Sequence, residues 1–158
     1  MSLNVPALRQ SFEIVVERAP DLTHRFYEIL FARYPHARSL FGRRSGPAQE
    51  EMLTRALAAV IDHLEDASWL RATLGALGDR HVGYGVTPEM YGWVGECLLA
   101  TLAEVAGPAW TPEVAGAWTE AYGAIASMMM AGSAARLGPP SSRLGPTSSR
   151  RGPDSVRV

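Results

Sequence analysis

The stretch LRATLGALGDRHVGYGVTPE, residues 70–89, decides the fold that this sequence predicts. Its first part, Leu70 to Val82, is largely apolar and long enough for a helix, and His81 stands near its end. The Gly-Tyr-Gly run that follows interrupts the helix. Thr87-Pro88-Glu89 then supplies the cap, the first-turn proline and the acidic residue that favour a new helix start. The stretch therefore predicts two successive helices with a histidine at their junction.

The rest of the chain up to about Ala131 also has helical patterns. Cap residues and prolines mark the expected helix boundaries: Asn4 with Pro6, Pro20-Asp21, Tyr34-Pro35, Pro47, Ser68 as the cap of the His81 helix, and Thr111-Pro112-Glu113. No run of alternating polar and apolar residues favours a strand. We therefore expect an all-α fold with six or seven helices.

Size and composition indicate one ordinary globular domain. The chain has 158 residues, 47% of them hydrophobic and 20% charged. No apolar run approaches the roughly 20 residues that a bilayer span needs, and the N-terminus lacks the pattern of a signal peptide. Cys97 is the one cysteine, which excludes an intramolecular disulfide and a cysteine-rich metal site. These features favour a cytoplasmic location.

The C-terminal part differs from the rest. We expect a folded domain over residues 1–133 and a disordered tail over 134–158, in which Arg, Gly, Pro and Ser recur with a period of seven residues. From Arg136 onward there are five Arg and one Asp, about +4, whereas residues 1–135 carry ten Arg and fifteen acids, about −5. An acidic body argues against a nucleic-acid binder. The tail is either an electrostatic tether or a neutral extension.

Four residues upstream of His81 suggest the chemistry: Tyr27, Phe41, Gln49 and Leu53. A neutral imidazole that faces an apolar slot, across from a tyrosine and a glutamine, suits an iron porphyrin, because the polar pair can hydrogen-bond a small ligand on the opposite side from the imidazole. Each residue alone has an ordinary alternative. A lone histidine or aromatic residue on a helix is usually part of the core, and a first-turn glutamine is usually solvated.

Several blocks of this sequence, taken in order, resemble the globins, and among them the bacterial flavohaemoglobin-type globin domain and its free-standing single-domain relatives. The resemblance covers roughly residues 3–132. The matching blocks are PDLTHRFY at 20–27, Tyr34-Pro35 through Leu40-Phe41, QEEML at 49–53, RHVGYGV at 80–86, Thr87 through Leu99, and Trp118 with Ala121-Tyr122-Gly123.

This resemblance implies a globin fold around a haem b pocket. His81 matches the proximal iron ligand, and Tyr27 and Gln49 match the residues that stabilise a ligand on the distal side. Phe41, Leu53 and Tyr91 match residues that line the haem. The resemblance also implies diatomic ligands such as dioxygen and nitric oxide. A hydrogen bond from the tyrosine to a polarised ligand contributes about 1.5–3 kcal/mol, or roughly ten- to a hundredfold in affinity.

Two family features are missing from the sequence. A glutamate that contacts the proximal histidine in flavohaemoglobins would fall at or near Ser133, yet no Asp or Glu occurs between Glu120 and Asp154. Without it, His81 should donate less electron density to iron. The chain also lacks a glycine-rich dinucleotide motif after a strand, so any turnover would need a separate reductase.

Three functions are compatible with these features. The first is reversible dioxygen binding, with nitric oxide dioxygenation where an external reductase exists. The alternative is a haem-based gas sensor or redox relay that acts through a protein partner. A haem-free helical interaction module is the third, and the combination of His81 with Tyr27, Gln49 and Phe41 argues against it.

Overall fold

The computed structural model describes residues 3–41 and 46–137, of which 133–137 are described by their backbone alone. The described residues form only helices, which confirms the predicted all-α class. In chain order these are α1 (Val5–Arg18), α2 (Leu22–Arg33), the 3₁₀ helix η1 (Pro35–Leu40), α3 (Pro47–Asp62), α4 (Ala67–Gly83), α5 (Pro88–Ala106), the 3₁₀ helix η3 (Gly107–Ala109) and α6 (Pro112–Leu137).

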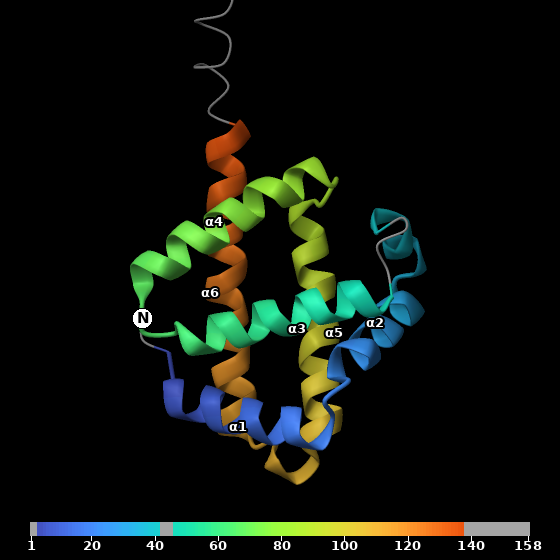
Figure 1. Ribbon diagram of the computed structural model, residues 1–158, viewed down its shortest axis with the longest axis vertical. Helices are drawn as coiled ribbons and strands as arrows, with labels where there is room; N and C mark the ends of the chain where they lie inside the picture. The colour runs from blue at the N-terminus through green and yellow to red at the C-terminus, as the bar shows by residue number, and fades with distance from the viewer. Residues whose placement is uncertain (1–2, 42–45, 138–158) are drawn as a thin grey trace, which may run out of the picture.

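Two long helices, α5 and α6, form the back of the molecule, and the others cross them (Figure 1). Helix α1 crosses near one end of the pair and packs on both helices. Helix α4 packs along α6 at the other end, while α3 lies between α1 and α4 in this view and packs mainly on α2. His81, near the end of α4, therefore lies on a different helix from Tyr27 on α2 and Gln49 on α3, and α4 packs mainly on α6.

The core has two parts. The larger lies among α1, α2, α5 and α6, and its fully buried side chains include Leu8, Leu22, Leu30 and Leu102. The smaller joins α4 to α5 and α6 through Leu70, Leu74, Tyr91, Ala126 and Met129. The second cluster is the one that fixes the helix bearing His81.

Most expected helix boundaries are confirmed, and one cap is corrected. Asn4 accepts a hydrogen bond from the backbone of Ala7 at 3.3 Å, and Thr111 accepts one from Val114 at 3.2 Å. The N-cap of α4 is Asp66, whose carboxylate accepts from the Trp69 N–H at 3.1 Å, so the prediction of Ser68 was wrong. An ionised carboxylate satisfies a first-turn N–H at least as well as a hydroxyl.

Helix α6 continues through Leu137, four residues past the predicted domain boundary at residue 133. The residues expected to begin the tail, 134–137, are therefore helical. The remainder of the predicted tail, 138–158, lies outside the described residues.

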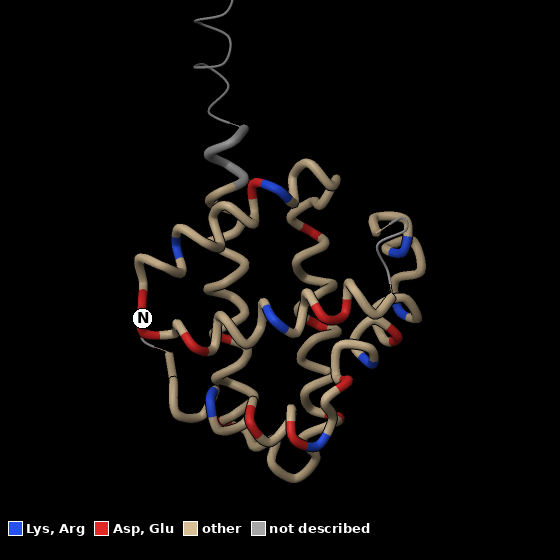
Figure 2. Tube along the Cα trace, in the orientation of Figure 1, with Lys and Arg blue, Asp and Glu red and all other residues tan. Residues whose placement is uncertain are grey.

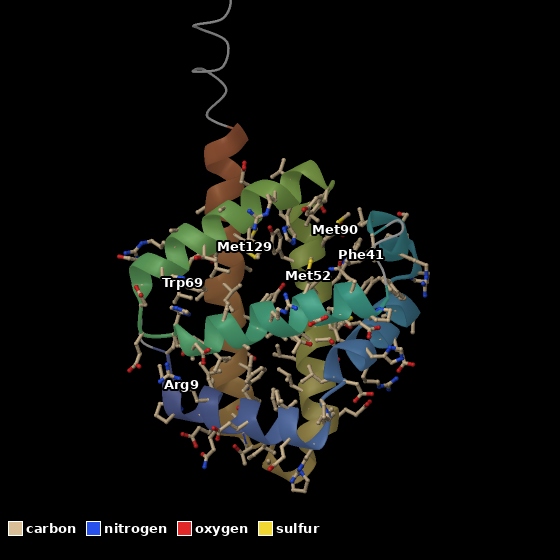
Figure 3. All side chains as sticks on the ribbon, in the orientation of Figure 1. Arg9, Phe41, Met52, Trp69, Met90 and Met129 are labelled. Carbon is tan, nitrogen blue, oxygen red and sulfur yellow. The ribbon has the colours of Figure 1, made fainter. Side chains whose placement is uncertain are left out.

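Glycines allow α4 and α6 to cross with their backbones in contact. A Cβ atom added to Gly78 would lie 1.9 Å from the carbonyl oxygen of Met129, and one added to Gly132 would lie 2.0 Å from that of Gly75. Figure 3 shows Met129 at this crossing. No larger residue fits either glycine position without a shift of backbone. The helix that carries His81 is thus positioned by direct contact with α6.

Acidic and basic residues are spread over all the long helices (Figure 2), and ion pairs link neighbouring helices. Arg25 on α2 binds Glu104 on α5 at 2.6 Å, and Arg33 binds Glu96 at 2.6 Å. Both pairs are exposed, so each contributes at most about 1 kcal/mol. Within the described ranges, no helix is both long and apolar enough to cross a membrane.

Candidate functional site

Tyr27, Gln49 and Phe41 come together from three elements, α2, α3 and the turn after η1. The Gln49 amide donates a hydrogen bond to the Tyr27 hydroxyl oxygen over 3.2 Å. The Phe41 ring meets the Tyr27 ring edge-on, with 5.4 Å between centroids. Tyr27 is only 8% exposed, and burial raises the pKa of its phenol. The hydroxyl therefore stays protonated at neutral pH, and its own proton remains available for another acceptor.

Polar contacts between α2 and α3 hold this arrangement in place. The Thr23 hydroxyl donates to the backbone carbonyl of Glu50 at 3.1 Å and also lies 3.1 Å from the Thr54 hydroxyl. His24 Nδ1 lies 2.9 Å from a carboxylate oxygen of Glu50. These contacts involve the direct sequence neighbour of Gln49, so they set the register between Tyr27 and Gln49.

His81 is held by its own helix in the tautomer that a metal ligand needs. Its Nδ1 lies 2.8 Å from the backbone carbonyl oxygen of Leu77, one turn earlier. A carbonyl can only accept, so Nδ1 carries the proton and Nε2 keeps its lone pair. Burial lowers the pKa of this half-buried imidazole. His81 is therefore neutral and presents Nε2 as a free donor of electrons.

The turn after His81 is closed by its backbone. The N–H groups of Tyr84 and Val86 both donate to the His81 carbonyl, at 3.0 and 3.1 Å. Gly85 has φ +89°, a conformation that side chains rarely tolerate, and this lets the chain reverse into α5. The Gly-Tyr-Gly break predicted from the sequence thus fixes the end of the helix on which His81 lies.

Tyr91, at the start of α5, is buried in the smaller core cluster beside α4 and α6. The Tyr122 hydroxyl on α6 donates to the Tyr91 carbonyl at 2.7 Å. The Tyr122 ring also packs so closely on Gly95 that a Cβ there would lie 2.6 Å from it. Helix α6 therefore holds the start of α5 in place next to the histidine helix.

The residues present fit a haem in two further ways. Leu53 is half-buried and packs at the edge of the larger core, one turn beyond Gln49 on the same helix. The large apolar side chains that the described residues leave exposed are Met52, 59% exposed on α3, and Tyr84, 44% exposed after α4. One adjoins the distal residues and the other adjoins His81, and Figure 3 shows Met52 and Phe41 on the side of α3 turned toward α4. Both are apolar groups that a ligand bound beside them could cover, although singly exposed apolar residues are common on protein surfaces.

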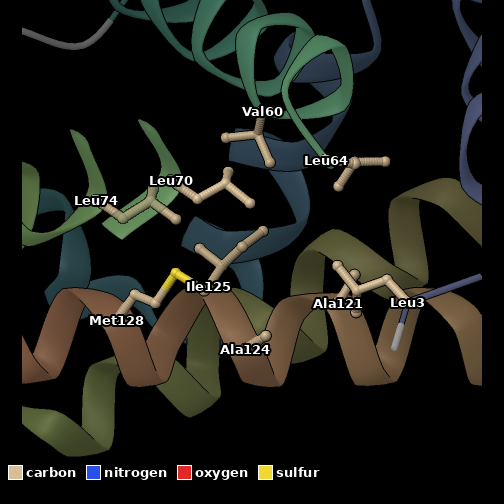
Figure 4. Close-up of a pocket in the computed structure, with 9 residues that line it drawn as sticks. All are labelled: Leu3, Val60, Leu64, Leu70, Leu74, Ala121, Ala124, Ile125 and Met128. Carbon is tan, nitrogen blue, oxygen red and sulfur yellow. The ribbon is translucent and has the colours of Figure 1, made fainter. Parts of the chain in front are cut away.

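A separate apolar pocket lies at the other end of α4. It is lined only by apolar residues: Leu3, Val60, Leu64, Leu70, Leu74, Ala121, Ala124, Ile125 and Met128 (Figure 4). None of the six expected site residues lines it. The pocket therefore belongs to the packing of α3, α4 and α6 and is distinct from the candidate site.

Sequence reasoning missed the supporting contacts. The Leu77 carbonyl was foreseeable, since a helical histidine can reach the carbonyl four residues earlier. His24 on α2 also contacts α3, through the carboxylate of Glu50. That contact depends on how α2 and α3 pack, for which the sequence carries no signal.

Comparisons with known proteins identify the family and the fold. The globin family matches residues 24–129. The flavohaemoprotein of Bordetella pertussis is 35% identical over 119 residues, which are 74% of this chain and 30% of that protein. That of Rhodopirellula baltica is 33% identical, again over 74% of this chain and 29% of its own length. The chain thus spans about 30% of the length of these relatives.

Two solved structures are similar over most of the chain. A bacterial globin from Campylobacter jejuni superposes with a TM-score of 0.71 at 27% identity, covering 82% of this chain and 93% of that one. A Rhodothermus marinus protein, assigned as a nitric oxide dioxygenase and engineered as a carbene transferase, gives 0.71 at 30% identity, covering 82% and 90%.

Fold and site together define an all-helical protein with a neutral histidine near the end of α4 and a hydrogen-bonded tyrosine and glutamine on α2 and α3. The chain belongs to the globin family, as the family match over most of its described residues shows. Membership of this family, with flavohaemoproteins among the relatives, implies that the chain binds haem.

Proposed function

We propose that this globin holds haem b through His81, binds dioxygen reversibly, and supports nitric oxide dioxygenation when a separate reductase supplies electrons. When bound, the haem iron would provide the site for the diatomic ligand. Phe41, Leu53 and Tyr91 would contact the porphyrin. Relatives named flavohaemoproteins, and a structural neighbour assigned as a nitric oxide dioxygenase, support the direction of this proposal.

The observation that carries the proposal is the hydrogen bond from Gln49 to the oxygen of Tyr27. Because Gln49 occupies a lone pair of that oxygen, the phenolic proton is directed elsewhere. Burial keeps the phenol protonated. Tyr27 is thus a preset donor for a ligand that gains negative charge on binding, and Gln49 is the residue that orients it.

The electronic role of His81 follows from its hydrogen bond. A backbone carbonyl is a weaker acceptor than a carboxylate, so the Leu77 contact polarises the imidazole only modestly. Helix α6 has its acidic residues at Glu113 and Glu120, both in its first half. We infer a neutral proximal ligand, which favours reversible binding over cleavage of the O–O bond.

Absorption spectroscopy tests the proposal directly. Purified protein, reduced with dithionite and then exposed to air, should give a stable oxygenated spectrum. His81→Ala should lose the haem, and Tyr27→Phe should retain it while shortening the life of the oxygenated form. Nitrate formation from nitric oxide with an added reductase would extend the result to turnover. Colourless protein that rejects added haemin would contradict the proposal.

One observation favours the second candidate, a gas sensor or redox relay. The backbone contact of Gly78 with Met129 couples the histidine helix to α6 without intervening side chains. A ligand-driven shift of α4 would therefore move α6. Hydrogen exchange on α6 that differs between ligand-free and ligand-bound protein would support this role, and a six-coordinate haem that excludes dioxygen would favour the relay.

A further inference from the structure

Thr23 is a buried polar residue where α2 packs on α3. Its side chain is 3% exposed, and it precedes Tyr27 by four residues, so both residues lie on the same face of α2. Thr101 on α5 is the other buried threonine of the described residues, and its hydroxyl donates to the Cys97 carbonyl of its own helix at 2.7 Å. Thr23 differs because its hydrogen bonds go to another helix.

Three oxygen atoms form a closed triangle at this contact. The Thr23 hydroxyl lies 3.1 Å from the Glu50 carbonyl oxygen and 3.1 Å from the Thr54 hydroxyl. The Thr54 hydroxyl lies 3.0 Å from the same carbonyl oxygen. The two hydroxyls supply two protons, and the carbonyl offers two lone pairs. Each arrangement in which both protons bond within the triangle connects Thr23 to the Glu50 carbonyl, directly or through Thr54.

The carbonyl in this triangle belongs to the first turn of α3, which also carries Gln49. This helix begins at Pro47, and the N–H groups of a first helical turn have no carbonyl partner within their own helix. Gly46 occupies the cap position and has no side chain that could bond them. The contact of His24 with Glu50 joins the same turn to α2, but the His24 side chain is 55% exposed. The triangle therefore fastens the turn from the buried side.

The position of this turn matters because the Gln49 amide must reach the Tyr27 hydroxyl. The nitrogen and oxygen atoms are 3.2 Å apart, at the long end of the range for such a hydrogen bond. An outward movement of the first turn of α3 by a few tenths of an ångström would weaken the bond, since no shorter contact compensates. The Tyr27 hydroxyl would then lose the partner that orients its proton.

We propose that Thr23 is a positioning residue that holds Gln49 against Tyr27 through the backbone of α3. Thr23 thereby sets how strongly the site favours dioxygen over carbon monoxide. This inference rests on the proposed function. Dioxygen gains negative charge on binding and accepts the tyrosine hydrogen bond, whereas carbon monoxide stays nearly neutral and gains little from it. Loosening the first turn of α3 should therefore weaken the retention of dioxygen and leave that of carbon monoxide almost unaffected.

Thr23→Val tests this role, because valine keeps the branched shape of threonine and removes the hydroxyl. In the haem-loaded protein, the dioxygen dissociation rate should rise roughly twofold to tenfold, as for the loss of one hydrogen bond, without a comparable rise for carbon monoxide. Thr23→Ser retains the hydroxyl and should restore the wild-type ratio of the two rates. Thr101→Val is the matched control: it removes an equally buried hydroxyl that bonds only within its own helix, so both rates should stay unchanged.

The side-chain amide resonances of Gln49 in NMR spectra report its position without a bound ligand. Thr23→Val should shift them, and Thr101→Val should not. Thr54→Val is a second variant, and it should raise the dioxygen dissociation rate less, because Thr23 still reaches the carbonyl.

Unchanged Gln49 resonances in Thr23→Val, or a dioxygen dissociation rate equal to that of Thr101→Val, would overturn the proposal. If Thr23→Val does not fold, an unchanged rate in Thr54→Val overturns it. Wild-type protein that binds no dioxygen would contradict the proposed function instead, and the Gln49 resonances would then decide whether Thr23 positions this residue.

Discussion

Replacing Gly78 with alanine should damage the crossing that positions His81. The new Cβ would start 1.9 Å from the carbonyl oxygen of Met129 and 2.5 Å from its carbonyl carbon, whereas real Cβ contacts are almost never below 3.0 Å. The obstacle is backbone, so no side-chain rotation relieves it. Helices α4 and α6 must separate by about 1 Å, which loosens the packing of Leu70 and Leu74 against Met129. Overpacking of this kind costs about 1–3 kcal/mol.

A matched control separates this cost from helix propensity. Gly123→Ala, on α6, adds the same methyl group at a position with no atom within 4 Å. In a helix interior alanine is favoured over glycine by about 1 kcal/mol, so the control should stabilise the protein. The difference in unfolding free energy between the two variants then isolates the packing cost, about 1–3 kcal/mol.

Urea unfolding followed by circular dichroism measures both variants, with and without haem. The rate of haem transfer to a scavenging globin gives a second readout. Displacement of α4 should make haem loss faster in Gly78→Ala than in the wild type, whereas Gly123→Ala should lose haem at the wild-type rate. Equal stabilisation of both variants, with equal rates of haem loss, would refute the argument that α4 is positioned by backbone contact.

Three further predictions concern the site. Tyr27→Phe should release dioxygen roughly ten- to a hundredfold faster in stopped-flow measurements, because it removes a hydrogen bond to a charged acceptor; an unchanged rate would mean that Tyr27 does not face the ligand. His81→Gly should lose haem and recover it with added imidazole, as seen in the absorption spectrum, and failure of imidazole to restore the haem would argue against His81 as the ligand. The hydrogen bond to Glu50 raises the pKa of His24 in the folded protein. The ion pair of His24 with Glu50 therefore stabilises the fold fully below about pH 6.5, the pKa of an unperturbed histidine. This stabilisation is lost as the pH rises through the higher pKa of the folded state. NMR titration should place the His24 midpoint above that of the Glu50→Gln variant, and equal midpoints would count against the ion pair.

The sequence was sufficient where the signal is local. Asn4 and Thr111 cap helices because their side chains reach N–H groups three residues ahead, and Pro35 ends α2 because the residue before a proline avoids helical geometry. The order of the site residues, through their resemblance to globins, indicated the family. Asp66 was missed as a cap because Asp66 and Ser68 are both plausible cap types two residues apart, and their spacing does not separate them.

Contacts between distant segments could not be predicted in the same way. By propensity alone, glycine is unfavourable inside a helix, and only the packing of α4 on α6 shows Gly75 and Gly78 to be the points of closest approach. The Gln49–Tyr27 bond likewise depends on the register between α2 and α3, which Thr23 fixes through a backbone carbonyl. A residue type does not reveal such a partner when the partner is the backbone of another helix.

The two sides of the site impose different demands on a bound ligand. On one side, a buried and protonated Tyr27, oriented by Gln49, favours a ligand that has gained negative charge. On the other, the Nδ1–H of His81 donates a hydrogen bond to the Leu77 carbonyl, and burial keeps the imidazole neutral. Under the proposed function, strong stabilisation of a bound anion combined with modest electron donation from His81 would retain dioxygen rather than split it. Under the same proposal, nitric oxide dioxygenation would be limited by the supply of electrons to the iron.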